Sequence, residues 1–435
     1  MPRIHTFLHQ VSFAFSCVMV FGLPWSSAFF RIGFWGFVLC FFLSGRWRQK
    51  WSMLSRAWLV RIGLSLFFLA VISMTYTIAP FNLARDDAVR YAKLAAIGPL
   101  LFTFDSSRKR TAVLLAFCAG CAVLMLPTLL DGLGLAKLLG LPLERFANQS
   151  YTKEIASKGA PNLVYWRNQI VHGFFVAILC FVCLQKALSD SRYRVPLLGI
   201  ALLCIVDIIF FIQGRMAMLG LATALVFFAI LQIKTARGKL AVSIIAASLL
   251  MTSYVAIPNV SKRFDSASQE VQAYLTTGDI STSSGIRFHY WTISISLFNH
   301  SKWLGSGAGA FRHILVSTQD AFADQRHSHA HNEYLTVLSQ FGALGLLIFL
   351  GLLVISFLEI RHISVKMEKH CYSAVLVIFG LGSFSDSMLY NPHEGWTLVI
   401  FLALIGAGSG ANRFLPTSTV SRDEKAELWT TTSDA

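Results

Sequence analysis

Charged side chains are scarce in this sequence. Asp, Glu, Lys and Arg make up only 14% of its 435 residues, against roughly 25% in soluble domains, and 55% of the residues are hydrophobic. Such a chain cannot bury its apolar surface in one core, so lipid must cover much of it. The composition therefore excludes a soluble protein and predicts an all-α polytopic membrane protein.

Acidic residues are scarcer than basic ones, with 22 Asp and Glu against 37 Lys and Arg and a net charge of +15. A strongly basic chain can be a nucleic-acid-binding protein. Here, however, the basic residues stand in short clusters between apolar runs, which is the pattern that membrane topology produces. We therefore expect membrane lipids as partners and no nucleic acid.

A clear signal-peptidase site is also missing. The segment Met1–Gln10 is basic, and the apolar run after it continues through Pro24 without a small-residue cleavage site. We therefore expect this run to be the first transmembrane span.

Cysteines are few and lie only in apolar stretches. Two pairs, Cys118–Cys121 and Cys180–Cys183, have CxxC spacing, which in a soluble protein would suggest a zinc or thiol site. In the middle of a transmembrane helix this spacing only places two small residues on one face. We expect packing and no metal or redox role.

Apolar runs of about 20 residues are long enough to cross a bilayer as helices, and the sequence has about twelve such runs. The runs at 32–45 and 91–104 are the shortest. The full set is Val11–Phe30, Ile32–Gly45, Ala57–Ala79, Tyr91–Phe104, Thr111–Asp131, Gln169–Leu188, Pro196–Gln213, Met216–Ile233, Leu240–Ile257, Tyr334–Leu358, Cys371–Leu389 and Gly395–Asn412.

Short basic loops alternate along the chain and predict its orientation, because such loops stay in the cytoplasm. Both termini then lie inside, and two long segments, Gly132–Asn168 and Pro258–Glu333, lie on the opposite side of the membrane. We expect one transmembrane domain over residues 1–414 that includes these two loops, and a disordered cytoplasmic tail over 415–435. The basic clusters lie at 46–56, 108–110, 186–194, 234–239 and 361–369.

The long 258–333 segment is not of disordered composition and is expected to be functional. Ser283 or Ser284 could cap a helix that runs through Asn299. Its apolar residues recur at helical spacing, which suits a helix lying at the membrane surface or packed on the bundle. They include Ile286, Tyr290, Ile293 and Leu297.

Arginines near apolar runs are candidate ligand-binding residues, because charge at membrane depth is costly. Arg215 lies between two apolar runs on the outer side. It is either a snorkelling residue at a helix end or a cation for an anionic ligand. Arg287, in the first turn of the expected helix, is either solvated or an anion ligand beside the helix N-terminus. For Arg167, just before a span, snorkelling is the better interpretation.

Three alternating histidines, His327, His329 and His331, could share one face of a strand as metal ligands. No carboxylate or cysteine pattern completes such a site, so we expect no metal. His331 stands at the start of a span, followed by Asn332 and Glu333. It is either a polar residue at a helix start or a base that takes a proton from a sugar hydroxyl.

Two further features stand out near the end of the chain. Asp386 is an acid inside or at the end of an apolar run, where it could pair with an arginine or orient a histidine. Gly305, Gly307 and Gly309, in LGSGAGAF, are not expected to bind a nucleotide because no strand precedes them. They indicate a tight turn or a close backbone approach.

Together these motifs resemble the bacterial O-antigen ligase/polymerase family, and within it the O-antigen ligases. The resemblance covers the whole topology, but its specific motifs occupy about 210–220 and 285–345. These are the outer arginine after the seventh span, Arg-x3-Trp at Arg287 and Trp291, LGSGAGAF, and HNEYLTVLSQFGALG. The His-Asn-x-x-Leu…Gly signature is the most specific of them.

The resemblance implies an inverting glycosyltransferase of the membrane-embedded C-type fold that needs no metal or other cofactor. It would transfer O-antigen glycan from undecaprenyl diphosphate to a sugar of lipid A–core oligosaccharide, on the periplasmic face of the inner membrane. His331 matches the family's essential histidine, and Arg215 and Arg287 match its essential arginines. Asp386 and Arg167 match less specifically.

Three alternatives remain from the sequence. An O-antigen polymerase would use the same donor with a second lipid-linked glycan, and a protein O-oligosaccharyltransferase would use a Ser or Thr of a protein. A lipid-linked glycan transporter would also be polytopic, but it would be expected to show internal repeats and broken helices in matching halves. We find no such repeats.

Overall fold

In the computed structural model, the described part of the chain is residues 2–410, apart from 46, 142–166, 213, 236, 239–257 and 318–328. Every regular element within these residues is a helix. The first are α1 (Pro2–Gly22), α2 (Ser27–Leu43), α3 (Trp47–Leu54), α4 (Trp58–Ser73), α5 (Phe81–Tyr91), the 3-10 helix η1 (Ala92–Ala96), α6 (Ile97–Thr103), α7 (Ser107–Gly132) and α8 (Leu135–Leu138). The others are α10 (Gln169–Ser189), α11 (Arg194–Val206), the π-helix η3 (Asp207–Ile212), α12 (Arg215–Gln232), α14 (Pro258–Thr277), α15 (Ser283–His300), α16 (Ala310–Ser317), α17 (Glu333–Ile360), α18 (Lys366–Gly382) and α19 (Pro392–Gly408).

Six of the described helices are long and apolar enough to cross a membrane. The expectation of an all-helical, polytopic membrane protein is therefore confirmed, whereas the count of twelve spans is not. The predicted span Leu240–Ile257 and the predicted tail 415–435 lie outside the described residues. The six segments are Ile4–Gly22, Ser107–Gly132, Gln169–Ser189, Arg194–Ile212, Arg215–Gln232 and Glu333–Ile360.

The predicted first span, Val11–Phe30, is wrong in its bounds because the chain turns in the middle of it. Helix α1 ends at Gly22 and α2 begins at Ser27, after the cap Ser26, whose hydroxyl accepts a hydrogen bond from the Phe29 N–H. The two helices pack closely enough that a Cβ on Gly33 would lie 2.2 Å from the backbone nitrogen of Met19. Small residues allow such close helix contacts in membranes.

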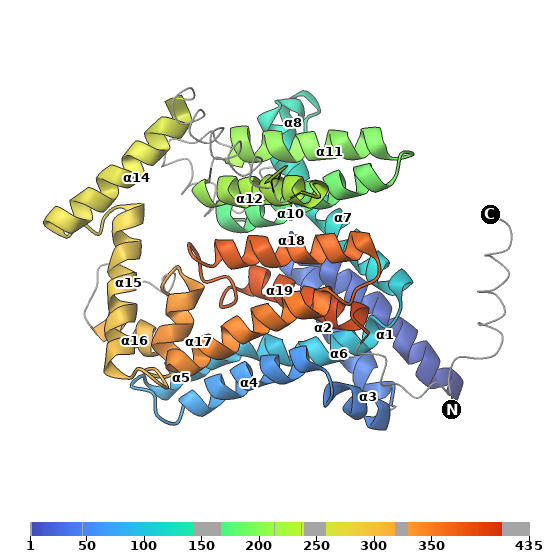
Figure 1. Ribbon diagram of the computed structural model, residues 1–435, viewed down its shortest axis with the longest axis horizontal. Coiled ribbons are helices and arrows are strands. Elements are labelled where there is room, and N and C mark those ends of the chain that lie inside the picture. The colour runs from blue at the N-terminus through green and yellow to red at the C-terminus, as the bar shows by residue number, and fades with distance from the viewer. Residues whose placement is uncertain are drawn as a thin grey trace.

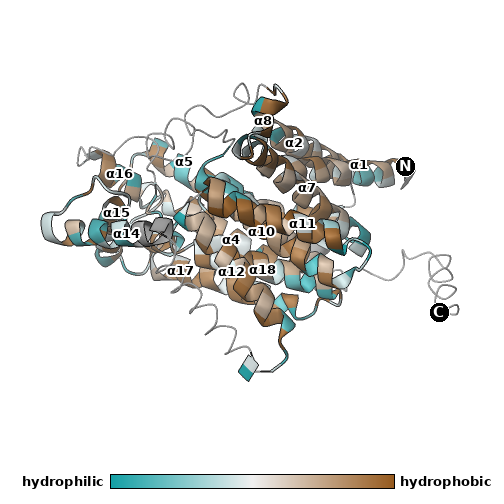
Figure 2. Cartoon of the chain, turned by 90° about the horizontal axis from the view of Figure 1, so that it is seen from above, coloured by the Kyte–Doolittle hydropathy of each residue, from teal (hydrophilic) through white to brown (hydrophobic). Residues whose placement is uncertain are grey.

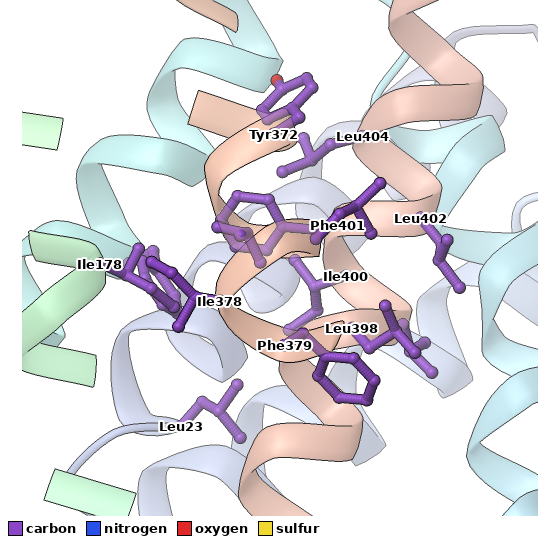
Figure 3. Packing of buried hydrophobic residues seen from close by; sticks show 14 of the residues in the cluster. Leu23, Ile178, Tyr372, Ile378, Phe379, Leu398, Ile400, Phe401, Leu402 and Leu404 are labelled. Carbon is purple, nitrogen blue, oxygen red and sulfur yellow. The ribbon is translucent and has the colours of Figure 1, made fainter. Parts of the chain in front are cut away.

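The core of the bundle is centred on α19, which is buried along nearly its whole length. Figure 3 shows side chains of α19, including Ile400 and Phe401, packed against Ile378 and Phe379 of α18. Ile178 of α10 lies beside α18 in the same view. These contacts hold the ends of α18 and α19, and the loop between them, in one place.

The 258–333 segment forms α14, α15 and α16, which lie at the opposite end of the molecule from α3 and the start of α1 (Figure 1). Hydrophilic residues are frequent in α14 and α15, whereas the bundle helices are mostly apolar (Figure 2). The predicted helix at Ser283–Asn299 is confirmed as α15, and it packs on α16 and α17 through Tyr290 and Leu297. The predicted cap is wrong: Thr282 caps the helix by accepting from the Gly285 N–H.

Helix α17 is broken at Gly342, where the backbone has φ 65° and leaves the helical region. The break frees backbone groups that an intact helix would pair. The segment before α16 pairs them instead: the N–H groups of Ser306 and Gly307 donate to the carbonyls of Ser339 and Gln340, both at 2.9 Å. On the other side of the break, the N–H groups of Ala343 and Leu344 donate to the carbonyls of Lys302 and Trp303.

The glycines of LGSGAGAF make this contact possible. Gly305, Gly307 and Gly309 have φ values of 71°, 87° and 78°, which only glycine adopts readily. A Cβ on Gly305 would lie 2.5 Å from the backbone of Gln340. The predicted tight turn and close backbone approach are confirmed, but the break in α17 was not predicted.

Candidate active site

Two residues from distant parts of the chain form the centre of the site. The imidazole Nδ1 of His331, just before α17, lies 3.1 Å from Oδ1 of Asp386. Asp386 lies in the loop after α18, four residues beyond the end of that helix at Gly382. The predicted span Cys371–Leu389 is therefore too long, and the acid is outside the helix. Asp386 was expected to pair with an arginine or to orient a histidine, and the structure shows the contact with a histidine.

The geometry assigns the tautomer of His331. An ionised carboxylate can only accept hydrogen bonds, so Nδ1 carries the proton and the lone pair lies on Nε2. Burial would raise the pKa of Asp386, but the hydrogen bond from His331, the charges of His331 and His329 whenever these imidazoles are protonated, and the backbone N–H of Ser387 outweigh it. Together they lower the pKa of Asp386 to about 2. A base with its second nitrogen held by a carboxylate is the arrangement of hydrolytic triads.

The backbone of His331 is unusual, with φ 49°. Among the described residues it is the one non-glycine residue with positive φ. The left-handed conformation costs a side-chain-bearing residue about 1–2 kcal/mol, and such strain often accompanies functional sites. It turns the chain sharply just before α17 begins.

Asn332 and Glu333 fix this turn in place. The side-chain oxygen of Asn332 caps α17 by accepting from the Leu335 N–H at 3.1 Å. The buried Glu333 accepts from the N–H groups of Leu389 and Tyr390 at 2.8 and 3.0 Å. Both predicted supporting residues therefore tie the His331 segment to itself or to the loop that carries Asp386.

Arg215, the first residue of α12, holds a carboxylate that the sequence analysis did not consider. Its NH2 and NH1 groups lie 2.9 and 3.4 Å from the two oxygens of Glu270, in α14. NH1 also donates to the Ser284 hydroxyl at 3.2 Å. The prediction that Arg215 binds an anion agrees with this forked contact, but the anion in the structure is the protein's own.

Arg287, in α15, connects the two halves of the site. Burial lowers the pKa of its guanidinium, while the charges of Asp386 and Glu270 raise it and that of Arg215 lowers it further. All three charged groups therefore lie near Arg287. Among the described residues, its guanidinium forms no hydrogen bond or ion pair, which leaves a partly buried cation available to an anionic ligand.

Arg167 is not brought to this group. Its guanidinium donates to the Pro24 carbonyl and the Ser27 hydroxyl, at 3.2 and 3.3 Å, in the turn between α1 and α2. These contacts fit the helix-end interpretation better than the predicted ligand-binding role.

His329, His331 and Asp386 also form a group whose ligand atoms lie within 4.8 Å of one another. Two imidazoles and a carboxylate are a set that several transition metals accept. From the sequence, His327 was the third candidate ligand, and no metal was expected. His327 lies outside the described residues. Asp386 supplies the carboxylate that the sequence pattern of histidines did not include.

An apolar cavity of about 440 Å³ lies close to the site. Residues of α2 and α19, such as Phe37 and Trp396, line it, and it extends to Tyr390. The ring of Tyr390 lies 5.2 Å from that of His329. Tyr390 therefore lies between this mainly apolar cavity and His329, the neighbour of His331.

Comparison with known proteins shows that the central part of the chain is similar to a known family. Residues 200–350 match a family model described as O-antigen ligase, which confirms the family resemblance inferred from the sequence. The match includes Arg215, Arg287 and His331 and supports a membrane enzyme of the O-antigen ligase/polymerase type. An uncharacterized protein of Haemophilus influenzae is 24% identical over 181 residues, which are 38% of this chain and 45% of that protein. The chain thus matches less than half the length of that relative.

Proposed function

We propose that this protein is a glycosyltransferase of the O-antigen ligase family and that it moves O-antigen glycan from undecaprenyl diphosphate to lipid A–core oligosaccharide. The observation that carries the proposal is the His331–Asp386 pair beside Arg215 and Arg287. A base and two cations are what attack on the anomeric carbon of a glycosyl diphosphate requires.

His331 acts as the general base. Nε2 takes the proton from the acceptor hydroxyl while its oxygen attacks the anomeric carbon, and Asp386 stabilises the imidazolium that forms. General-base catalysis of this kind contributes about 10²–10⁴-fold. Asn332, Glu333 and the loop that carries Asp386 keep the imidazole in position for this step.

The two arginines stabilise the leaving group. As the bond between the anomeric carbon and the phosphate oxygen breaks, undecaprenyl diphosphate departs with its added negative charge. Arg215 can bind two phosphate oxygens through its planar fork, and Arg287 adds a second positive charge. They supply the charge stabilisation that a divalent cation supplies in other transferases, so transfer proceeds without metal.

The surroundings of the site suit lipid-linked substrates. The apolar cavity between α2 and α19 offers room for a hydrocarbon chain beside the reactive groups. In this proposal the active site faces the periplasm. The diphosphate linkage of the donor supplies the energy for transfer, so the enzyme needs no ATP there.

The test is transfer by the purified protein from lipid-linked glycan to lipid A–core in excess EDTA. We expect full activity with the chelator. Activity that disappears in EDTA and returns with a divalent ion would instead assign His329, His331 and Asp386 to a metal.

A deletion strain separates this activity from that of a polymerase. Loss of a ligase leaves core-only lipopolysaccharide and polymer still attached to undecaprenyl diphosphate. Loss of a polymerase would leave core that carries a single repeat, and this outcome would contradict the proposal.

A further inference from the structure

The contact between Arg215 and Glu270 resembles a bound substrate group. Both carboxylate oxygens face the guanidinium fork, and Oε2 also accepts from the Ser284 N–H at 2.9 Å. Ser284 is the second residue of α15, so this N–H belongs to the first turn, where helices favour anions. The carboxylate thus takes the donors that a phosphate would use.

The charges around Glu270 also fit an anion larger than one carboxylate. Arg215 lies close enough to Arg287 to lower the pKa of the Arg287 guanidinium, and Glu270 is the one carboxylate whose contacts with Arg215 the structure describes. A diphosphate would carry more negative charge to the same place. The first turn of α15 and the fork of Arg215 can therefore accommodate more negative charge than the one carboxylate of Glu270 supplies.

We propose that Glu270 occupies the diphosphate site of the resting enzyme and is displaced by the donor. This inference rests on the proposed function of Arg215. The carboxylate keeps two neighbouring arginines from repelling each other and keeps α12, α14 and α15 together until the donor arrives. It also disfavours binding of small or weakly charged ligands at this site, because each of them must first replace the Arg215–Glu270 ion pair.

The exposure of the pair makes displacement feasible. The side chains of Arg215 and Glu270 are 33% and 18% exposed, and ion pairs that water reaches are weak. Burial opposes ionisation of Glu270, but hydrogen bonds from Arg215 and Ser284 outweigh it and lower the pKa of the carboxyl. The carboxylate is thus charged at neutral pH, and a diphosphate would repel it from the site.

The experiment measures binding of farnesyl diphosphate to the full-length protein in detergent, by calorimetry at low salt. Glu270→Gln keeps the size of the side chain and removes its charge, and we expect about five-fold tighter binding. Glu270→Asp keeps the charge but shortens the side chain, so it should fall between the wild type and Glu270→Gln. The matched control is Asp279→Asn, which removes a charge from the neighbouring loop, where Asp279 accepts from the Ser281 N–H, and should leave binding unchanged.

The two Glu270 variants distinguish displacement of Glu270 by the donor from a role in positioning Arg215. If Glu270 only positions Arg215, both Glu270 variants will bind the diphosphate more weakly than the wild type. Unchanged or weaker binding by Glu270→Gln, at an unchanged unfolding temperature, overturns the displacement. If Glu270→Gln lowers the unfolding temperature, the binding measured with Glu270→Asp is used instead, and unchanged or weaker binding by that variant overturns the displacement. Arg215→Ala should lose at least about ten-fold in affinity; normal binding by that variant would overturn the proposed role of Arg215 itself.

Discussion

His331 is the residue on which the proposed chemistry depends. We expect His331→Ala to reduce transfer by at least about 10²-fold, because it removes the base. Since the backbone there is left-handed, His331→Asn is a useful second variant: Asn tolerates this conformation, and it should be as inactive. His329→Ala should be much milder, because His329 Nδ1 lies 3.9 Å from Asp386 Oδ1, beyond hydrogen-bonding distance.

The measurement is the in vitro transfer assay with purified lipid-linked donor, at equal amounts of folded protein. Equal losses for His329 and His331 variants would indicate a shared structural or metal-binding role. The lowered pKa of Asp386 means that the carboxylate is ionised above about pH 4, and that its contribution to stability disappears only as the pH falls toward 2. Asp386 therefore stays ionised near neutral pH, and its titration does not shape the pH dependence of activity there.

Arg215 tests whether the shape of the cation matters as well as its charge. We expect Arg215→Lys to be nearly as damaging as Arg215→Ala, because lysine lacks the planar fork that binds two oxygens at once. Transfer rates and donor KM of both variants would be compared with those of the wild type. Recovery of most activity with lysine would mean that Arg215 supplies only positive charge.

The sequence revealed these residues because a charge or imidazole beside an apolar run is conspicuous. Glu270 was not found, since its partner lies 55 positions away and α14 has many charged and polar residues of its own. The pairing of His331 with Asp386 was only one of two options, because spacing along the chain does not show which side chains a helical bundle brings together. The position of Arg167 favoured snorkelling, and its ligand-binding role came only from a loose match to the family; the structure gives it other partners.

At the scale of elements, Gly342 is the position where α17 depends most on the absence of a side chain. A Cβ there would lie 2.4 Å from the backbone of Trp303, and its φ is 65°. We expect Gly342→Ala to lower both the unfolding temperature and transfer, with a cost of at least about 1–2 kcal/mol from the left-handed backbone alone.

Gly351→Ala in the same helix is the matched control. Nothing lies within 4 Å of its added Cβ, so alanine should be neutral or stabilise the helix by up to about 1 kcal/mol. Thermal unfolding of the detergent-solubilised protein gives the comparison. Similar unfolding temperatures for the two variants would mean that the break in α17 does not depend on Gly342.

Most helices could be predicted from hydropathy, because a run of apolar residues this long must be covered by lipid or protein. The bounds were less accurate where a turn is itself apolar, as at Leu23–Ser26. Periodicity could not reveal the break at Gly342, since apolar residues recur on both sides of it. The break depends on backbone groups from another segment.

At the scale of the whole molecule, the alternation of basic loops predicts that α14 faces the periplasm. We expect a cysteine at Ser268, an exposed position of α14, to react with a membrane-impermeant thiol reagent in spheroplasts. A cysteine at Ser55, exposed between α3 and α4, should react only after permeabilisation. The opposite pattern would invert the proposed topology.

The direction of α15 has a consequence for how substrates are encountered. Helices α10, α11, α12 and α18 run along the long axis of the molecule, and α15 crosses that direction at one end (Figure 1). Arg287 lies on α15, and Arg215 and His331 stand where α12 and α17 begin. If the long helices cross the membrane, as the proposed topology requires, α15 lies roughly along the membrane surface. Under the proposed function, a lipid-anchored donor would reach these residues by lateral diffusion in two dimensions, without leaving its own depth. Its effective concentration is then a mole fraction of the surrounding lipid, so that adding inert phospholipid at a fixed amount of donor slows the reaction by surface dilution.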